Sequence, residues 1–539
     1  MAGAQASNGE KRASVTGTGR PLVLAIDQGT TNTKALLVDP RTSAVVAVGS
    51  RSVGISFPAP GWVEQDAAEI WSATVAAVDE CLAQAPDARI AGVAVSNQRE
   101  SVVVWSRSTG VPLGPVLGWQ DARTSAACAA LGPVAAQEVR LRTGLSLDPM
   151  YSAPKMRWLL DAATASGADP ADVCLGTVDA WLIWNLTGEF ATEAGNAART
   201  LLLDLQELAW HPTLLSLFGV PGSALPEVRA SDGDFGTTRG VGSLPAGIPL
   251  VAVLADSHAA LYRHGCTQPG EGKATYGTGS SVMTPCAGAD QAPDGITTTL
   301  AWLTDGEPTY AREGNIIASG SALDWMARML GGDDEGGALL TALAAEATDT
   351  AGVVLVPAFS GLGAPYWDRA ATGVLTGVTG GTRRAHLALA ALEAVAHQVA
   401  DVVEAIESDG RARIGVLHAD GGATASGLLM ALQADLLGRP VRVADSPEAS
   451  ALGVTLLAAR TLGLAPRTEP APGAEPGARD PNLGTPDVQP RLTAAERVAR
   501  RRQWATAVAR SRGHAVGCEP DPTISTPTQE PVMEMKEHA

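Results

Sequence analysis

Two short segments rich in glycine and threonine, one in each half of the chain, constrain the fold most strongly. Gly29, Thr30 and Thr31 separate the apolar runs 22–26 and 34–38, and a second glycine-threonine segment lies at 274–281 in the other half of the chain. Two buried strands joined by a tight turn is the simplest interpretation. We expect Gly29 to adopt a conformation closed to other residues, and backbone N–H groups with threonine hydroxyls to enclose phosphate oxygens. An ordinary hairpin turn explains either segment alone equally well.

The two turns together predict duplicated lobes that grip one polyphosphate from opposite sides. A third glycine cluster at 420–423 follows a predicted strand and precedes a helix, as a backbone close to a nucleotide would. A Walker motif is absent, because no Gly-Lys-Ser/Thr opens a helix. Asp27, at the end of the first strand, is placed to hold Mg²⁺, with water as an intermediary because Mg²⁺ dehydrates reluctantly.

Strand and helix patterns alternate along the chain, which predicts an α/β fold. The 539 residues favour two or three domains. Apolar runs predict strands at 90–95, 248–254 and 353–357, and helical spacing predicts helices at 66–84, 386–408, 428–437 and 492–512. We expect a disordered arm (1–20), an N-terminal lobe (21–262), a C-terminal lobe (263–466), a loop (467–490), a C-terminal helix (491–512) and a disordered tail (513–539).

Charge and composition exclude several classes of protein. A formal charge of −18 gives no overall attraction to nucleic acid or anionic membranes. The six cysteines are scattered, with neither a disulfide framework nor metal-ligand spacing. We find no apolar stretch long enough for membrane insertion and no secretory signal among the first 20 residues, so we expect a cytoplasmic protein.

Asp256 is the best candidate for a general base. It ends the apolar strand 250–254 and opens a helix, where a carboxylate can face a cleft. Alone, such an aspartate is more readily explained as a helix cap. A base of this kind suits phosphoryl transfer to an alcohol, which also requires in-line positioning and neutralised phosphate charge.

These segments resemble the FGGY carbohydrate kinases, and among them most closely the glycerol kinases. The resemblance covers roughly 21–466, and more loosely the segment around Trp504. It is carried by residues 25–31, 60–64, 97–100, 176–184 and 361–368, by the second family motif within 373–393, and by the first motif around Lys155 and Trp158, apart from Ala162. It implies two actin-like (ribonuclease H-like) lobes that close over ATP, Mg²⁺ and a small polyol or sugar.

The resemblance also implies roles for individual residues. Asp256 corresponds to the catalytic base, and Arg99 and Glu100 to the pair that contacts polyol hydroxyls. The predicted nucleotide contacts are Gly29, Thr30, Thr31, Lys34, Thr278, Gly320, Asp324, Gly422 and Ser426. Two of these depart from the family: Ser426 stands where an asparagine lies near adenine, and Asp324 replaces a glutamine.

Three departures fall in the predicted acceptor pocket. Met150 stands where glycerol kinases have tyrosine, Ser257 replaces glutamine and Ser281 replaces phenylalanine. Two changes to small hydroxyl residues enlarge the pocket and make it more polar. They predict glycerol or a somewhat larger acceptor, such as a four- or five-carbon polyol or ketose.

Other functions stay open at this point. A xylulose-type pentulose kinase is the first alternative, although its usual Met-His pair is replaced by Arg99-Glu100. An actin-like ATPase switch would use the same phosphate turns without an acceptor, and a non-catalytic sugar sensor would use the lobes alone. Whether the chain forms homo-oligomers is also left open.

Overall fold

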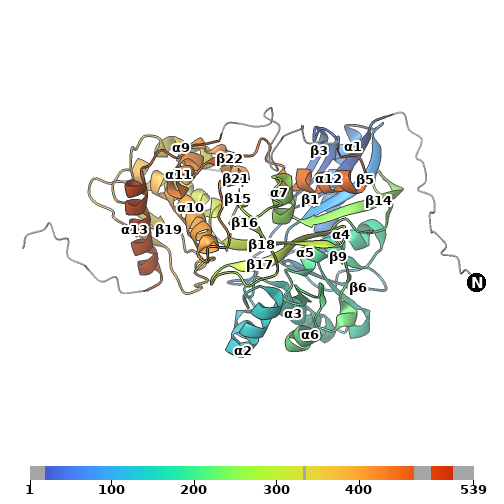
Figure 1. The fold of residues 1–539 in the computed structure, drawn as a ribbon. Helices are drawn as coiled ribbons and strands as arrows, with labels where there is room; N and C mark the ends of the chain where they lie inside the picture. Colours follow the sequence, from blue (N-terminus) through green and yellow to red (C-terminus); the bar gives the residue numbers. More distant parts are fainter. Residues whose placement is uncertain (1–18, 332–335, 466–486, 514–539) are drawn as a thin grey trace, which may run out of the picture.

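The computed structural model describes residues 19–331, 336–465 and 487–513, which form two lobes side by side (Figure 1). Each lobe is built on a six-stranded sheet. The first sheet has the order β13 (Thr237–Val241), β14 (Leu244–Ala255), β5 (Arg89–Asn97), β1 (Pro21–Gln28), β2 (Asn32–Val38) and β3 (Val45–Ser52). The second has the order β17 (Thr297–Thr304), β18 (Glu307–Ile316), β16 (Ser280–Cys286), β15 (Glu271–Tyr276), β21 (Val416–Asp420) and β22 (Val441–Val443).

Five strands of each sheet share one arrangement. In the first lobe β1, β2 and β3 are antiparallel neighbours, and β5 and β14 continue parallel to β1. In the second lobe β15, β16 and β18 are antiparallel neighbours, and β21 and β22 continue parallel to β15. The hairpin β1–β2 therefore has a counterpart in the hairpin β15–β16, and each hairpin carries one of the two glycine-threonine turns.

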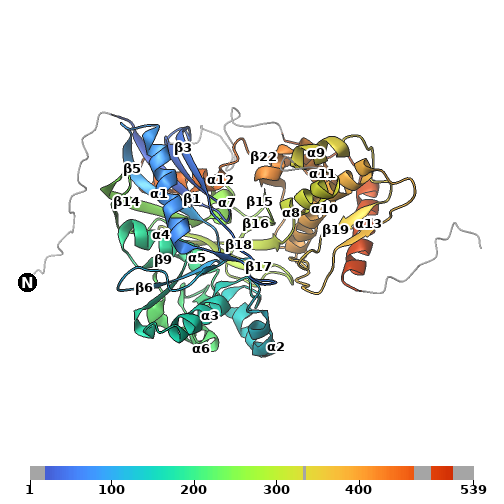
Figure 2. The same ribbon diagram turned by 180° about the vertical axis from the view of Figure 1, so that it is seen from behind.

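Alternating side chains of β1 bury both faces of the first sheet. Leu22, Leu24 and Ile26 lie in a cluster with α1 (Ala67–Ala83), whereas Val23 and Ala25 lie in another with α12 (Ala449–Thr461). Since successive side chains of a strand point to opposite faces, helices cover the sheet on both sides. Figure 2 shows α1 from the side hidden in Figure 1.

The second sheet is covered by a group of helices that share one large core. The long helix α10 (Arg384–Glu407) lies at its centre and packs against α8 (Gly320–Met329), α9 (Gly336–Ala344) and α11 (Gly427–Leu437). Helix α13 (Ala494–Ser511) joins this core through the buried Trp504. Short strands β19 (Val354–Val356) and β20 (Val374–Thr376) pair beside it.

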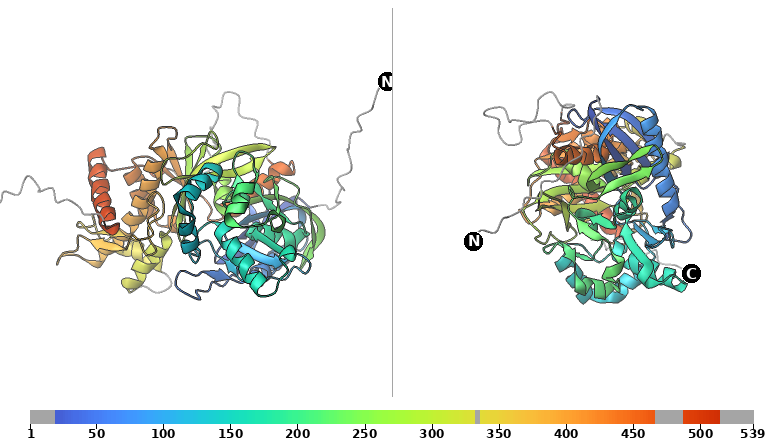
Figure 3. Two further views of the ribbon diagram at one scale, coloured as in Figure 1. Left: turned by 90° about the horizontal axis from the view of Figure 1, so that it is seen from below. Right: turned by 90° about the vertical axis from the view of Figure 1, so that its right-hand side faces the viewer.

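A smaller layer extends the first lobe away from its main sheet (Figure 3). It contains a four-stranded sheet of β4 (Glu64–Gln65), β7 (Val116–Leu117), β6 (Val102–Ser106) and β8 (Val173–Thr177). Helices α2 (Ser125–Thr143), α3 (Ser152–Ala165) and α6 (Pro212–Phe218) share its core, whereas α4 (Val178–Thr187) packs in the core of the main sheet and α5 (Ala194–Ala197) lies in a separate small cluster. This layer positions the loop that follows β5, where Arg99 and Glu100 lie.

The helices and strands predicted from periodicity are confirmed within a few residues at each end. The apolar runs 22–26 and 34–38 are β1 and β2, and the predicted helices are α1, α10, α11 and α13. Helix α12 shows a feature that local patterns do not reveal. It follows the second sheet in sequence, yet it packs on α7 (Asp256–Arg263), β1 and β5 of the first lobe. The chain therefore returns to the first lobe before α13.

Some predictions concern segments outside the described residues. The arm at 1–20 and the tail at 513–539 fall almost entirely there, as does most of the loop at 467–490. Among the described helices, none combines the length and the hydropathy that crossing a membrane requires.

Candidate active site

Both glycine-threonine turns border one cavity between the lobes. The cavity has a volume of about 390 Å³ and receives side chains from both sheets. Thr30 and Thr31 line it from the first lobe, and residues 277–281 from the second. The other residues that line it are Ile55, Phe57, Arg99, Glu100, Trp119, Gln120, Met150, Asp256, Ser257, Thr275, Asn315 and Ile316.

The first turn is held by its own backbone and by a tryptophan. The Gly29 N–H donates to the Asn32 carbonyl (2.9 Å), and Trp119 Nε1 donates to Thr30 Oγ1 (3.1 Å). Gly29 is absent from the residues with positive φ, so the expectation of a special backbone conformation is wrong. Space explains the glycine instead, because a Cβ there would lie 3.3 Å from the Asn32 oxygen.

The second turn is locked to the start of α8. The N–H of Gly320 donates to the Gly277 carbonyl (2.9 Å), and the N–H groups of Ser319 and Ser321 donate to the Thr278 carbonyl. A Cβ on Gly320 would lie 2.5 Å from the Gly277 oxygen, which requires glycine at this contact. At the end of β15, Gly421 has a φ of +93°, and a Cβ on it would lie 2.6 Å from the Tyr276 carbonyl oxygen.

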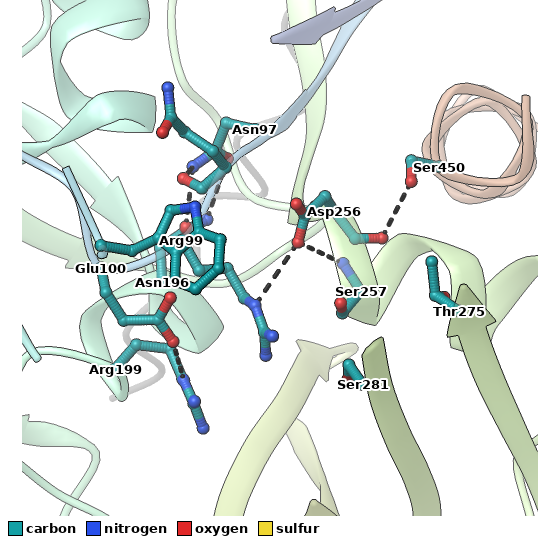
Figure 4. Close-up of polar contacts among 12 residues, drawn as sticks. Asn97, Arg99, Glu100, Asn196, Arg199, Asp256, Ser257, Thr275, Ser281 and Ser450 are labelled. Atoms are coloured by element: carbon teal, nitrogen blue, oxygen red, sulfur yellow. Dashed lines mark hydrogen bonds and ion pairs between the residues drawn. The ribbon is translucent and has the colours of Figure 1, made fainter. Parts of the chain in front are cut away.

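Asp256 lies at the carboxyl end of β14, as the first residue of α7 (Figure 4). Its carboxylate accepts from the Ser257 N–H (2.5 Å) and lies 3.4 Å from Arg99 Nε. Ser450 of α12 donates to its carbonyl (3.1 Å), so the returning helix helps to hold it. Burial raises the pKa of Asp256, and the positive charge of Arg99 opposes the rise.

Asp27 is electrostatically coupled to Asp256. Burial, and then the charge of Asp256, raise the pKa of Asp27 to about 7. Lys34 lowers it only weakly, because its ammonium binds Glu448 at 2.7 and 3.0 Å. The first lobe therefore presents two neighbouring carboxylates with little cationic compensation for Asp27.

Beneath the cavity four side chains form a chain of alternating charges. Arg99 donates to Glu313 (2.6 Å), Glu313 lies 2.7 Å from Arg199, and Arg199 donates to Glu100 (2.7 Å). Burial alone would raise the pKa of Glu313, but the two arginines outweigh it and hold that pKa well below its usual range. Each charge is paired, so the chain can hold Arg99 and Glu100 rigidly at the cavity wall.

Sequence reasoning missed both inner members of this chain. Glu313 lies on β18 of the second lobe, and Arg199 follows α5 in the first. Arg199 stands among small and apolar residues, whereas Glu313 follows Arg312 and precedes Gly314 and Asn315, so neither local sequence indicates a partner.

The predicted site residues divide into two groups. The cavity brings together Thr30, Thr31, Arg99, Glu100, Met150, Asp256, Ser257, Thr278 and Ser281. The remaining predicted nucleotide contacts do not line it: Lys34 is paired with Glu448, Asp324 is exposed on α8, Gly422 begins a 3-10 turn, and Ser426 caps α11. Gly29 and Gly320 support the two turns through backbone hydrogen bonds, and the charge of Asp256 acts on Asp27.

His258 follows Asp256 closely, yet it does not line the cavity. Its ring is fully buried, and neither ring nitrogen has a hydrogen-bond partner among the described residues. Burial, reinforced by Arg99, lowers its pKa well below the usual value. A neutral, buried imidazole fits a structural role better than that of a rival base.

Comparison with known proteins agrees with this geometry. The family model for the N-terminal domain of the FGGY family of carbohydrate kinases matches residues 22–262, and the model for the C-terminal domain matches residues 272–462. The chain belongs to the FGGY family of carbohydrate kinases. The resemblance noted in the sequence is thereby confirmed.

Two relatives of this FGGY kinase indicate what it resembles. It is 44% identical to an apulose kinase of Pectobacterium atrosepticum, over 91% of this chain and 98% of that kinase. It is 43% identical to a glycerol kinase of Thermus brockianus, again over 91% and 98%.

Solved structures confirm the two-lobed actin-like fold. Plasmodium falciparum glycerol kinase with ADP matches at a TM-score of 0.80 and 27% identity, over 91% of this chain and 98% of that one. A xylulose kinase of Rhodospirillum rubrum matches at 0.74 and 28%, over 90% and 98%. This FGGY kinase is thus an ATP-using phosphotransferase that acts on a hydroxyl of a small polyol or sugar.

Proposed function

We propose that this kinase phosphorylates a four- or five-carbon polyol or ketose in preference to glycerol. The observation that carries the proposal is the wall of the 390 Å³ cavity, where Met150, Ser257 and Ser281 stand together with Arg99 and Glu100. Two small hydroxyl side chains leave room and offer hydrogen bonds to further hydroxyl groups. The relatives do not decide between substrates, since an apulose kinase and glycerol kinases are about equally identical to this chain.

Asp256 is proposed to accept the proton of the acceptor hydroxyl as that oxygen bonds to the γ-phosphorus of ATP and the bond from this phosphorus to the bridging oxygen breaks, which releases ADP. Its raised pKa makes it a better base than an ordinary aspartate, and Arg99 at 3.4 Å keeps part of its charge. Arg99 and Glu100 orient adjacent hydroxyls, one as donor and the other as acceptor. Thr30 and Thr278 present hydroxyls and backbone N–H groups to the phosphates from opposite lobes.

The single carboxylate of Asp27 is compatible with Mg²⁺. Among the described residues no cluster of three or more histidine, cysteine or acidic side chains could hold a metal by itself. Mg²⁺ in kinases typically takes one or two carboxylates and completes its shell with water and phosphate oxygens. Asp27 would hold such an ion, which when bound neutralises the phosphate charge. A cytoplasmic location and the formation of homo-oligomers stay predictions.

Release of ADP tests the proposal. We would measure kcat/KM for glycerol, erythritol, threitol, xylitol, xylulose, ribulose, apulose and gluconate at one ATP concentration, with a sample lacking acceptor as baseline. A four- or five-carbon acceptor should exceed glycerol. Slow ADP release that is indifferent to every acceptor would instead favour the ATPase switch.

Asp256→Asn tests the assigned base. Transfer should fall about 10²–10⁴-fold, because a positioned general base contributes that much. Binding of Mg-ATP, measured by calorimetry, should persist. Asp161→Asn, on the exposed face of α3, is the matched control. Loss of nucleotide binding in the Asp256 variant would contradict its role toward the acceptor.

A further inference from the structure

Ser281 and Asn315 face the cavity from the second lobe as register partners. Ser281 lies on β16 and Asn315 opposite it on β18, and both line the cavity. Directly opposed residues on antiparallel strands have Cβ atoms about 4.5–5.5 Å apart. The pair therefore forms one polar patch, in a sheet different from the one that carries Asp256.

Within this patch one hydrogen-bond acceptor and one hydrogen-bond donor stay available to a ligand. Ser281 Oγ donates to Glu313 (3.0 Å), so its oxygen lone pairs can accept. Asn315 Oδ1 accepts from Arg99 Nη2 (3.4 Å), which orients the amide. Asn315 Nδ2 is then buried without a partner among the described residues. Buried polar groups are nearly always paired, so this donor points to a ligand atom.

Arg99 relates the patch to the proposed base. Its Nε lies 3.4 Å from Asp256, and its Nη2 lies 3.4 Å from Asn315. Arg99 thus contacts the carboxylate and the amide through two different guanidinium nitrogens. Asp256 and Asn315 line the same cavity from different lobes, so an acceptor whose reacting hydroxyl lies at Asp256 would turn its far carbons toward Asn315.

We propose that Ser281 and Asn315 form a distal acceptor subsite, in which Asn315 determines specificity. Asn315 Nδ2 donates to an oxygen on the fourth or fifth carbon of the acceptor, and Ser281 accepts from the same or the neighbouring hydroxyl. This inference rests on the proposed function and assigns to Ser281 and Asn315 the binding of the far end of the longer acceptor.

Asn315→Ala tests the subsite through a ratio of two acceptors. For the best four- or five-carbon acceptor, kcat/KM should fall about tenfold, the equivalent of one lost neutral hydrogen bond. For glycerol, which does not reach Asn315, it should change about twofold or less. Ser281→Ala should shift the ratio in the same direction. Asn185→Ala is the matched control, because its amide binds the Trp181 carbonyl on α4, away from the cavity.

Stability separates a subsite from a structural role. Asn315→Ala removes an unpaired buried N–H group together with one long hydrogen bond from Arg99, so the thermal midpoint of the ligand-free protein should change little. An equal loss of kcat/KM with all acceptors would mean that Asn315 only positions Arg99. An unchanged kcat/KM ratio between the acceptors would mean that Asn315 does not contribute to specificity. Either result overturns the proposal.

Binding distinguishes this inference from the proposed function. If the wild-type enzyme phosphorylates no acceptor, the proposed function fails. The thermal shift that xylulose or xylitol gives the wild-type protein then still tests the subsite. A shift that Asn315→Ala abolishes and Asn185→Ala retains supports the subsite. A shift that is absent in the wild type, or equal in all three proteins, overturns it.

Discussion

The two lobes have equivalent hairpins in equivalent five-strand arrangements, but the carboxylate beside the hairpin has different surroundings in each lobe. In the first lobe Asp27 on β1 is the register partner of Ser96 on β5. In the second lobe the positions are exchanged, with Thr275 on β15 opposite Asp420 on β21. Each lobe thus pairs one carboxylate with one hydroxyl next to its phosphate turn.

The surroundings of the two carboxylates decide what each can do. Asp420 Oδ2 lies 2.7 Å from His264 Nε2, and the buried Lys273 donates to Thr275 (2.8 Å). Burial would raise the pKa of Asp420, but His264 and Lys273 outweigh it and lower that pKa. For Asp27 burial and the charge of Asp256 outweigh the opposing effects of Ser96 and Lys34, and its pKa is raised to about 7. The second lobe neutralises its carboxylate internally, whereas the first leaves Asp27 dependent on a cation from outside.

Asp420→Asn should have the largest effect on stability. The substitution removes the largest of the negative charges that act on the buried Lys273, and removing the partner of a buried charge costs about 3–5 kcal/mol. Because the pKa of Asp420 is lowered on folding, its contribution is present at neutral pH and disappears as the pH falls through the folded pKa. The free energy of unfolding, measured in urea at pH 7, should therefore drop by that amount.

Asp161→Asn provides the control for this change. Asp161 forms an exposed pair with Arg157, and such pairs contribute about 1 kcal/mol or less. An Asp420 variant as stable as the Asp161 variant would show that the second carboxylate is not a structural element.

Asp27→Asn should give the opposite result. Turnover should fall about 10²-fold or more, the usual effect of removing an electrostatic group that acts on the transition state. The ligand-free protein should nevertheless become more stable at pH 8. The raised pKa of Asp27 means that the folded state loses stability as the pH rises from about 4 to about 7, and asparagine avoids this loss.

Thermal midpoints at pH 5 and pH 8, without and with Mg-ADP, check this second prediction. The variant should exceed the wild type more at pH 8 than at pH 5, and Mg-ADP should reverse the order. A variant less stable than the wild type at pH 8 would mean that Asp27, like Asp420, is already compensated within the protein.

The local parts of this comparison could be predicted from the sequence. The two turns and the position of Asp256 follow from apolar runs that end in glycine, threonine or aspartate, which are signals within ten residues. The resemblance to FGGY kinases added Arg99 and Glu100. These predictions succeed because a strand end and its turn are specified by neighbours in the chain.

The non-local parts could not be predicted. Glu313 meets Arg99 across 214 residues, and Arg199 meets Glu100 across 99. Register between β1 and β5, or β15 and β21, decides that Asp27 and Asp420 stand beside hydroxyls, and no local pattern determines that register. The return of α12 to the first lobe escaped prediction for the same reason, since its apolar face fits either core equally well on periodicity alone.

The smallest expected difference lies between the two threonines of the turns. Thr30 Oγ1 accepts from Trp119, which also lines the cavity, whereas the Thr278 side chain forms no hydrogen bond within the described part of the chain. Thr278→Ala should therefore raise only the KM for ATP, by about fivefold, the worth of one neutral hydrogen bond. Thr30→Ala should raise the KM for ATP similarly and also that for the acceptor, because Trp119 loses its anchor. Thr30→Ser and Thr278→Ser retain the hydroxyl and should behave as wild type in the same steady-state assay. If Thr30→Ala leaves the acceptor KM unchanged, the two turns act on phosphate alone, and the lobes differ only in their carboxylates.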